Sequence, residues 1–160
     1  MIAMKKILVP HDFSDTSEAA VRYALALAQN FNAKVHLLHV SDKARFEMAT
    51  EFPLGLDGAL DEAVRERLLK ILTLQENIAF KPILEFRSGA PAAEITRYAM
   101  DADIDLIVMG THGRGVVAHA VMGSVAEKVV RHAPCPVLTV RHPEREFIMP
   151  EATERVDAVM

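Results

Sequence analysis

The sequence predicts an α/β fold: a single-domain open parallel five-stranded sheet with helices on both faces. Five short runs are apolar at nearly every position, as in strands buried on both faces of a parallel sheet. Segments with apolar residues at helical spacing separate these runs. Parallel strands joined through helices need right-handed crossovers, which cover both faces of the sheet. With 160 residues, 51% of them hydrophobic, the chain has the size and composition of one such domain.

The first predicted elements are a strand, a helix and a second strand. The run Lys6–Pro10 is branched and apolar, and it stops at a proline. Ser14 or Asp15 can cap a helix after it, in which apolar residues recur at helical spacing up to Ala28. The run Lys34–Val40 is the second apolar strand. Together they form one β-α-β unit.

The later elements continue this alternation after an irregular segment. Residues 41–57 contain Pro53 and Gly55, which break regular structure, so we expect a long connection there. Helical periodicity returns from Asp57 to Gln75. The remaining predicted elements are a strand at Pro82–Arg87, a helix from Pro91 to Ala99, a strand at Asp105–Gly110, a helix at Ser124–His132 and a strand at Pro136–Val140. Ligands of such folds bind at the carboxyl ends of strands where the winding direction reverses, so we expect the chemistry after the first and fourth strands.

The charge balance argues against nucleic acid and membrane partners. The formal net charge is -4, whereas nucleic acid and anionic membranes attract concentrated positive charge. Residues 143–160 carry five acids and two arginines, which is -3 of that total. We therefore expect one folded domain at 1–142 and an acidic tail at 143–160 that is partly disordered or contacts a partner.

Cysteine content and apolar run lengths indicate a soluble cytoplasmic protein. Cys135 is the one cysteine, so no intrachain disulfide can form, which fits a reducing compartment. Between Pro134 and Pro136, a structural thiol is a better interpretation than a redox sensor. The apolar start is interrupted at Pro10 too early for a signal peptide, and no apolar run has membrane-spanning length.

A glycine-rich segment, Gly110–Val125, follows the fourth strand. Its spacing is Gly110, two residues, Gly113, nine residues, Gly123 and Ser124. Glycines let a ligand approach the main chain closely, and the start of a helix offers unpaired N–H groups and a positive dipole end to a phosphate. From these residues alone, a phosphate site and an ordinary turn with a helix cap both remain open.

Four motifs together resemble the universal stress protein family over about residues 4–141. They are KKILVPHDFSDTSEAAVRYALALA, VHLLHV, DLIVMGTHGRG and GSVAEKVVRHAPCPVLTV, in this order. The complete Gly-x2-Gly-x9-Gly-Ser pattern is similar to that of the ATP-binding branch of the family. The resemblance implies the strand order 3-2-1-4-5 and ATP in the crevice between the first and fourth strands.

The resemblance also implies the residues of an ATP site. Pro10, His11 and Asp12 would border the adenosine, with Asp12 accepting a hydrogen bond from adenine or ribose. Val40 would offer its backbone to the adenine edge. The other implied residues are Met109 and Gly110 near the ribose, and His112, Gly113, Arg114, Gly123, Ser124 and Val125 near the phosphates. His11 departs from the small, often hydroxylated residue that the family usually has there.

The favoured function is an ATP-binding regulatory or stress-response module with slow or no hydrolysis. The glycine-rich segment lacks the lysine of phosphate-loop NTPases, which leaves Arg114, with a divalent ion such as Mg²⁺ or Mn²⁺ as a further candidate, to neutralise phosphates. One alternative is a weak ATPase or adenylate-forming enzyme, although the serine-glycine-glycine and histidine-glycine-histidine signatures of such enzymes are missing. Another is a structural or chaperone-like dimer with a vestigial pocket.

The last strand and the histidines carry the remaining expectations. Pro136–Val140 is an apolar edge strand that invites pairing with a second copy, and the resemblance implies a homodimer through it. His36 and His39 differ in parity on one strand, so core or edge histidines are favoured over a metal pair. His11 and Asp12 are neighbours at a strand end and should project differently, which argues against a catalytic pair.

Overall fold

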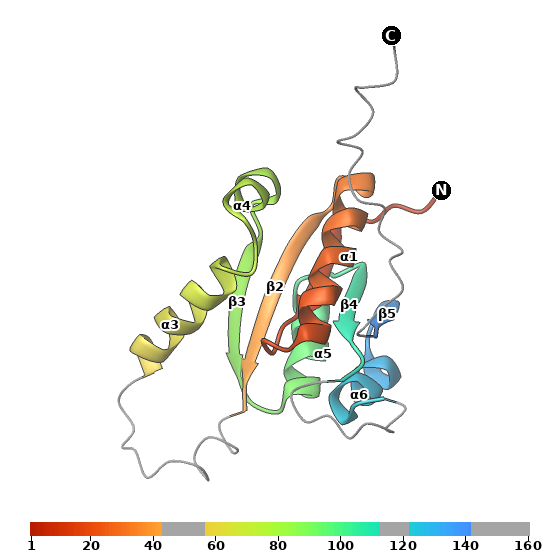
Figure 1. Cartoon of the computed structure of the whole chain (residues 1–160). Helices are drawn as coiled ribbons and strands as arrows, with labels where there is room; N and C mark the ends of the chain where they lie inside the picture. Colours follow the sequence, from red (N-terminus) through yellow and green to blue (C-terminus); the bar gives the residue numbers. More distant parts are fainter. Residues whose placement is uncertain (43–56, 113–121, 142–160) are drawn as a thin grey trace.

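The computed structural model describes residues 1–42, 57–112 and 122–141 (Figure 1). Its strands are β1 (Lys6–Pro10), β2 (Lys34–Ser41), β3 (Ile83–Ser88), β4 (Leu106–Gly110) and β5 (Val137–Val140). Its helices are α1 (Asp15–Phe31), α3 (Asp57–Leu69), α4 (Leu74–Phe80), α5 (Pro91–Asp101) and α6 (Ser124–His132). The expected connection at 41–57 and the expected tail at 143–160 fall mostly or wholly outside the described residues, so the predicted domain boundary stays a prediction.

The five strands form one parallel sheet in the order β3-β2-β1-β4-β5. This confirms the predicted fold class and strand order. The chain winds from β1 to β2 and β3 on one side, and then returns to β4 and β5 on the other. The winding direction therefore reverses between β1 and β4, where ligands of such sheets bind.

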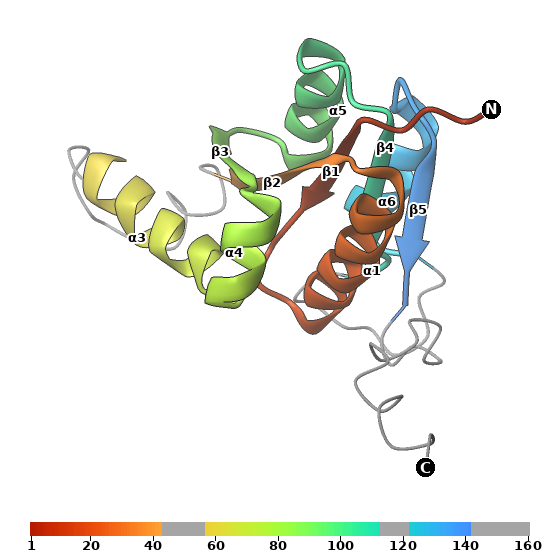
Figure 2. The same cartoon turned by 90° about the horizontal axis from the view of Figure 1, so that it is seen from above.

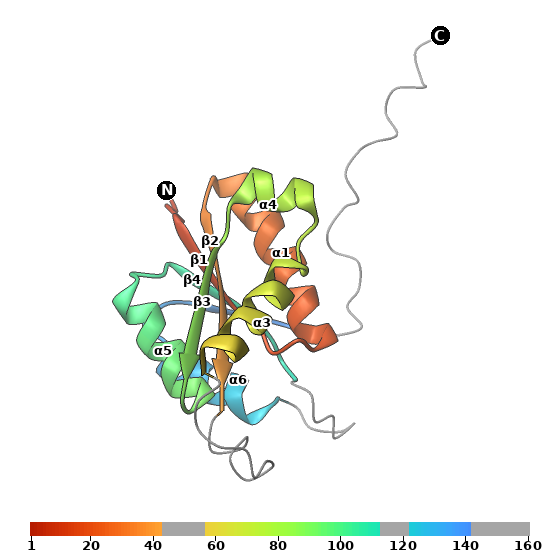
Figure 3. The same cartoon turned by 90° about the vertical axis from the view of Figure 1, so that its left-hand side faces the viewer.

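Helices cover both faces of the sheet. The views of Figures 2 and 3 show α1 and α4 on one side of the strands and α5 on the other. Along β1, Ile7 and Val9 pack in the core beneath α1, whereas Leu8 packs in the core that α5 and α6 cover. All three side chains are fully buried, which explains why the run reads as continuously apolar instead of alternating.

Helix α1 begins at the position that the sequence indicated. Ser14 is its N-cap, in extended backbone conformation, and its side chain accepts a hydrogen bond from the Ser17 N–H. The Ser17 hydroxyl group in turn accepts from the Ser14 N–H at 3.2 Å, which completes a capping box. Asn32 ends the helix in the left-handed conformation, which asparagine tolerates better than most residues.

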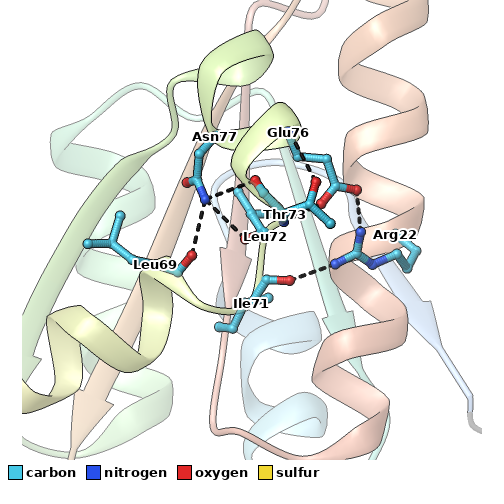
Figure 4. A network of polar contacts seen from close by, with 7 residues as sticks. All are labelled: Arg22, Leu69, Ile71, Leu72, Thr73, Glu76 and Asn77. Atoms are coloured by element: carbon cyan, nitrogen blue, oxygen red, sulfur yellow. Dashed lines mark hydrogen bonds and ion pairs between the residues drawn. The ribbon is translucent and has the colours of Figure 1, made fainter.

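The single helix predicted from Asp57 to Gln75 is wrong, because the chain breaks between α3 and α4. Thr73 caps α4: its backbone N–H donates to Glu76 Oε2 at 2.7 Å, and its Oγ1 accepts from the Glu76 N–H at 3.2 Å. Arg22 of α1 pairs with Glu76 Oε1 at 2.5 Å and donates to the Ile71 carbonyl oxygen at 2.8 Å (Figure 4). The capping box and the arginine together satisfy the polar groups that the break exposes.

The Asn77 amide completes the turn between the two helices. Its Nδ2 lies 3.1 Å from each of the carbonyl oxygens of Leu69, Leu72 and Thr73 (Figure 4). These carbonyl groups belong to the end of α3 and the turn, where intrahelical partners run out. In the part of the chain that the structure describes, no helix has both the length and the apolar character needed to cross a membrane.

Candidate functional site

The strands β1 and β4 separate at their carboxyl ends. Their ladder pairs Ile7 with Leu106 and Leu8 with Ile107, whereas β4 stays paired with β5 as far as Gly110 and Val140. The starts of α1 and α6 lie at this end of the sheet, toward which the strand arrows point in Figure 1. Those sequence-predicted residues after β1 and β4 that the structure describes thus meet at one edge.

The start of α6 is held against the end of β4. The Gly123 N–H donates to the Thr111 carbonyl oxygen at 2.6 Å, and a Cβ at Gly123 would lie 2.9 Å from the same oxygen. Glycine is therefore required for this close approach. Gly123 is the N-cap of α6, and among the described residues no side chain caps the helix.

The residues after Gly123 offer polar groups at the helix start. Ser124 is exposed, and Val125 is half-buried against the core beneath α5 and α6. An uncapped helix start presents N–H groups and the positive end of the dipole, which suit an anion. Of the predicted phosphate residues, Gly113 and Arg114 lie outside the described residues.

Gly110 permits a second close approach, between β4 and α1. A Cβ at Gly110 would lie 2.7 Å from both Cβ and Oγ1 of Thr16. The Thr16 hydroxyl group donates to the carbonyl oxygen of His112, and Thr16 and Thr111 are both buried. The Thr111 N–H donates to the Val140 carbonyl oxygen at 2.8 Å, and its Oγ1 lies 2.8 Å from His112 Nδ1. No sequence pattern pointed to either threonine, yet both position the turn that holds His112.

Asp12 binds the start of α1 through one carboxylate oxygen. Its Oδ1 accepts from the Ser14 N–H at 3.0 Å, from the Ser14 hydroxyl group and from the Ser17 hydroxyl group at 3.0 Å. These contacts place a carboxylate at the positive end of the α1 dipole, where it is stabilised. The structure thereby fixes the orientation of Asp12 at the crevice, with the contacts concentrated on Oδ1.

His11 is buried and lies with Phe13 and His39 in one aromatic cluster. Its backbone N–H donates to the Leu38 carbonyl oxygen at 2.8 Å, and its Nδ1 accepts from the Phe13 N–H at 3.1 Å. The His11 carbonyl oxygen lies 2.8 Å from His39 Nδ1. The ring of His11 thus faces the aromatic cluster while the Asp12 carboxylate faces the serines, so the two side chains project differently, as the sequence indicated.

The backbone of Val40 points toward the crevice. The ladder of β2 with β1 ends at Leu38, but its ladder with β3 continues to Ser41. The Leu38 carbonyl group points to β1, because it accepts from His11. Backbone groups alternate in direction along a strand, so those of Val40 point to the same side as those of Leu38, beyond the end of β1. Pro10 and Met109 are buried beside this opening.

The other histidine of β2 lies in the opposite core. His36 is buried, and its Nδ1 lies 2.7 Å from the Tyr98 hydroxyl group of α5. Burial lowers the pKa of His36, helped by the charges of Lys6 and Lys34, so the ring stays neutral. Burial and the charge of Glu85 raise the pKa of Tyr98 to about 12. His36 and His39 therefore lie on opposite faces of the sheet, as their parity predicted.

Cys135 lies just before β5, the last strand and an edge of the sheet. Cys135 is half-buried against the core beneath α5 and α6, and burial raises its pKa with help from the charge of Asp105. The thiol therefore stays protonated, which fits a structural role.

Strand β5 is an edge of the sheet, and Leu138 on it is 37% exposed. The described residues hold no group of three or more histidine, cysteine or acidic side chains that could bind a metal ion.

Comparisons with known proteins place the chain among relatives of one kind. The model of the Universal stress protein family matches residues 4–141. Universal stress protein MJ0531 of Methanocaldococcus jannaschii is 37% identical over 147 residues, which cover 89% of this chain and 85% of that protein. The solved structure of MJ0577 from the same organism is 32% identical with a TM-score of 0.76, and the match covers 90% of this chain and 100% of that one. A solved universal stress protein in complex with cAMP is 27% identical with a TM-score of 0.56, covering 87% and 98% of the two chains.

Proposed function

Since the chain belongs to the universal stress protein family, we propose that it binds ATP between the carboxyl ends of β1 and β4. The bound state would serve as a signal in a regulatory or stress-response role. The observation that carries the proposal is the start of α6, closed onto Thr111 through Gly123 and without a side-chain cap among the described residues. A related structure holds cAMP, which is also an adenine nucleotide.

The nucleoside would lie on the β1 side of the crevice. Pro10, His11 and Asp12 would border it, and Asp12 Oδ2 would accept a hydrogen bond from ribose or adenine while Oδ1 stays on the serines. The backbone of Val40, which points beyond the end of β1, would meet the adenine edge. Met109 and Gly110 would lie near the ribose.

The phosphates would lie against the start of α6. The N–H groups of Ser124 and Val125 and the Ser124 hydroxyl group are donors of the kind that phosphate oxygens accept. Gly113, Arg114 and His112 would contact the phosphates from the preceding loop, and a Mg²⁺ or Mn²⁺ ion would share the charge. Because Asp12 is held at the α1 cap, no described carboxylate in this scheme orients an attacking water, so we propose slow or no hydrolysis.

The proposal extends to assembly and location. A homodimer would form through β5, Pro136–Val140 in the sequence-based prediction, because this edge strand exposes Leu138. An isologous contact of two β5 strands would extend the sheet across the pair. We place the protein in the cytoplasm, with neither nucleic acid nor membrane as a partner, on its single cysteine and its negative net charge.

Calorimetry with the purified full chain tests ATP binding, with Mg²⁺ or Mn²⁺ present. The Gly123→Val variant should abolish saturable binding, because its side chain would collide with the Thr111 carbonyl oxygen and displace the start of α6. Val130→Ala is the matched control, since Val130 lies exposed on the same helix. A wild-type protein that neither binds ATP nor retains an adenine nucleotide on purification would refute the proposal, and robust phosphate or pyrophosphate release would favour the enzyme alternatives.

A further inference from the structure

Phe13 follows the proposed nucleoside residues in an unusual backbone conformation. Its φ is 64°, in the left-handed region that a bulky side chain disfavours. Such a conformation persists only where surrounding contacts hold it. Phe13 is therefore a point at which side-chain packing decides the path of the chain after β1.

The left-handed conformation of Phe13 orients the residues on both sides of it. It brings the Phe13 N–H to His11 Nδ1 at 3.1 Å, and the Ser14 N–H to Asp12 Oδ1 at 3.0 Å. The second contact belongs to the network that fixes the Asp12 carboxylate. The orientation of Asp12 toward the crevice thus depends on the conformation of Phe13.

Among the described residues, three side chains from three parts of the chain lie around the Phe13 ring. The His11 ring centroid lies 5.2 Å away at an interplanar angle of 70°, and that of His39 on β2 lies 4.9 Å away at 40°. The Arg67 guanidinium carbon lies 3.9 Å from the ring centroid, in the geometry of a cation–π interaction. Arg67 is in the last turn of α3, so this contact joins α3 to the loop after β1.

Helix α3 is anchored at the same point. Leu68, next to Arg67, is fully buried, whereas Arg65, Arg67 and Leu69 are exposed. A change in the position of the last turn would therefore move both the buried leucine and the stacked guanidinium group. The Arg67–Phe13 contact joins the docking of α3 to the conformation of the β1 loop.

We infer that Arg67 is a positioning residue for the nucleoside site and that site occupancy stabilises the docked position of α3. The inference depends on the proposed function, because the ligand concerned is ATP. Arg67 acts through Phe13, which holds the loop that presents Asp12. Coupling of this kind is reciprocal: if a docked α3 favours ATP, then ATP favours a docked α3 by the same free energy.

The first test is ATP affinity by calorimetry in Arg67→Ala, Arg67→Lys and Arg65→Ala. Losing an exposed cation–π contact should weaken ATP binding about two- to fivefold in Arg67→Ala, and Arg67→Lys should recover part of the loss. Arg65→Ala is the matched control, because Arg65 lies on the same helix but lines an open groove with Leu69 and Leu84. Equal affinity of Arg67→Ala and wild type would overturn the inference.

The second test is amide hydrogen exchange of residues 62–69 and 13–17, with and without ATP. We expect ATP to slow exchange in α3 of the wild type, and Arg67→Ala to quicken exchange in both segments of the ligand-free protein. Quicker exchange with unchanged ATP affinity would overturn the positioning role. If the wild type bound no ATP, the proposed function would fail and the positioning role with it, whereas unchanged exchange in ligand-free Arg67→Ala would refute the α3 contact alone.

Discussion

Replacing Gly110 with alanine tests the close approach of β4 and α1 that shapes the crevice. The added Cβ would lie 2.7 Å from Thr16 Cβ and 2.9 Å from the Thr16 carbonyl carbon. Non-bonded carbon atoms normally lie about 3.5–4.0 Å apart, so the new methyl group would overlap its neighbours by about 1 Å. The Thr16 hydroxyl group could rotate away, but Cβ and the carbonyl carbon move only if the start of α1 moves.

Overpacking of this kind costs about 1–3 kcal/mol. We therefore expect Gly110→Ala to lower the free energy of unfolding by about 2 kcal/mol, which is about 1 M in the urea midpoint at an m value near 2 kcal/mol/M. Urea unfolding of the nucleotide-free protein, followed by far-ultraviolet circular dichroism, measures the loss. The absence of nucleotide keeps any effect on ATP binding out of the result.

A double-mutant cycle with Thr16→Gly assigns the loss to this contact. Thr16→Gly removes the Cβ and Oγ1 atoms, so Gly110→Ala should cost less in that background than in the wild type. The reasoning would be refuted if Gly110→Ala cost less than about 0.5 kcal/mol, the range of an ordinary surface substitution. An equal cost in the two backgrounds would also refute it.

Three further predictions concern the helix junction and the buried histidine. Burial raises the pKa of Glu76, but hydrogen bonds from Thr73 and the charge of Arg22 outweigh it, so the pKa lies below its usual value. Glu76→Gln, which can keep the capping box, should therefore cost about 0.5 kcal/mol at neutral pH. In urea titrations the difference from wild type should shrink as pH falls past the ordinary glutamate pKa and vanish below the lowered pKa of the folded protein. Thr73→Ala should cost about 1 kcal/mol by the same assay, and an unchanged midpoint would contradict the cap assignment. The pKa of His36 is lowered in the folded protein, so its contribution to the free energy of unfolding is complete above the unfolded pKa of about 6.5 and declines below it. His36→Gln should therefore reduce the loss of stability on acidification. An unaltered dependence of stability on pH would count against the buried neutral ring.

The sheet was predictable because its central strands are apolar at nearly every position. Ile7, Leu8 and Val9 are all fully buried, and such a run has few alternatives in an α/β chain. The break between α3 and α4 was predictable in principle, since Thr73 and Glu76 have the spacing of a capping box. Apolar periodicity did not reveal the break, because apolar residues keep their helical spacing across it. Such spacing reports which residues face the core, and it does not report a short hydrogen-bonded turn between two helices.

Some residues of the candidate site were also predictable from the sequence, and others were not. Gly110 and Gly123 could be singled out from the sequence because glycine alone lacks a Cβ. In the structure each lies where a Cβ would collide with a neighbouring segment. Thr16 and Arg67 carry no local signal. Thr16 reaches the carbonyl group of His112, 96 residues away, and Arg67 stacks on Phe13 across the fold. Residues whose role comes from long-range contacts are visible only once the fold brings the segments together.

The N-terminal ends of α1 and α6 indicate in which direction a nucleotide would lie. Both α1 and α6 begin at the crevice, so each directs the positive end of a dipole toward it. The start of α1 already holds the Asp12 carboxylate, whereas the start of α6 has no side-chain cap among the described residues. Phosphates placed at α1 would meet a negative charge, and phosphates placed at α6 would meet N–H groups. The proposed orientation, with the nucleoside at Asp12 and the phosphates at Ser124, is therefore the one in which charges of like sign stay apart.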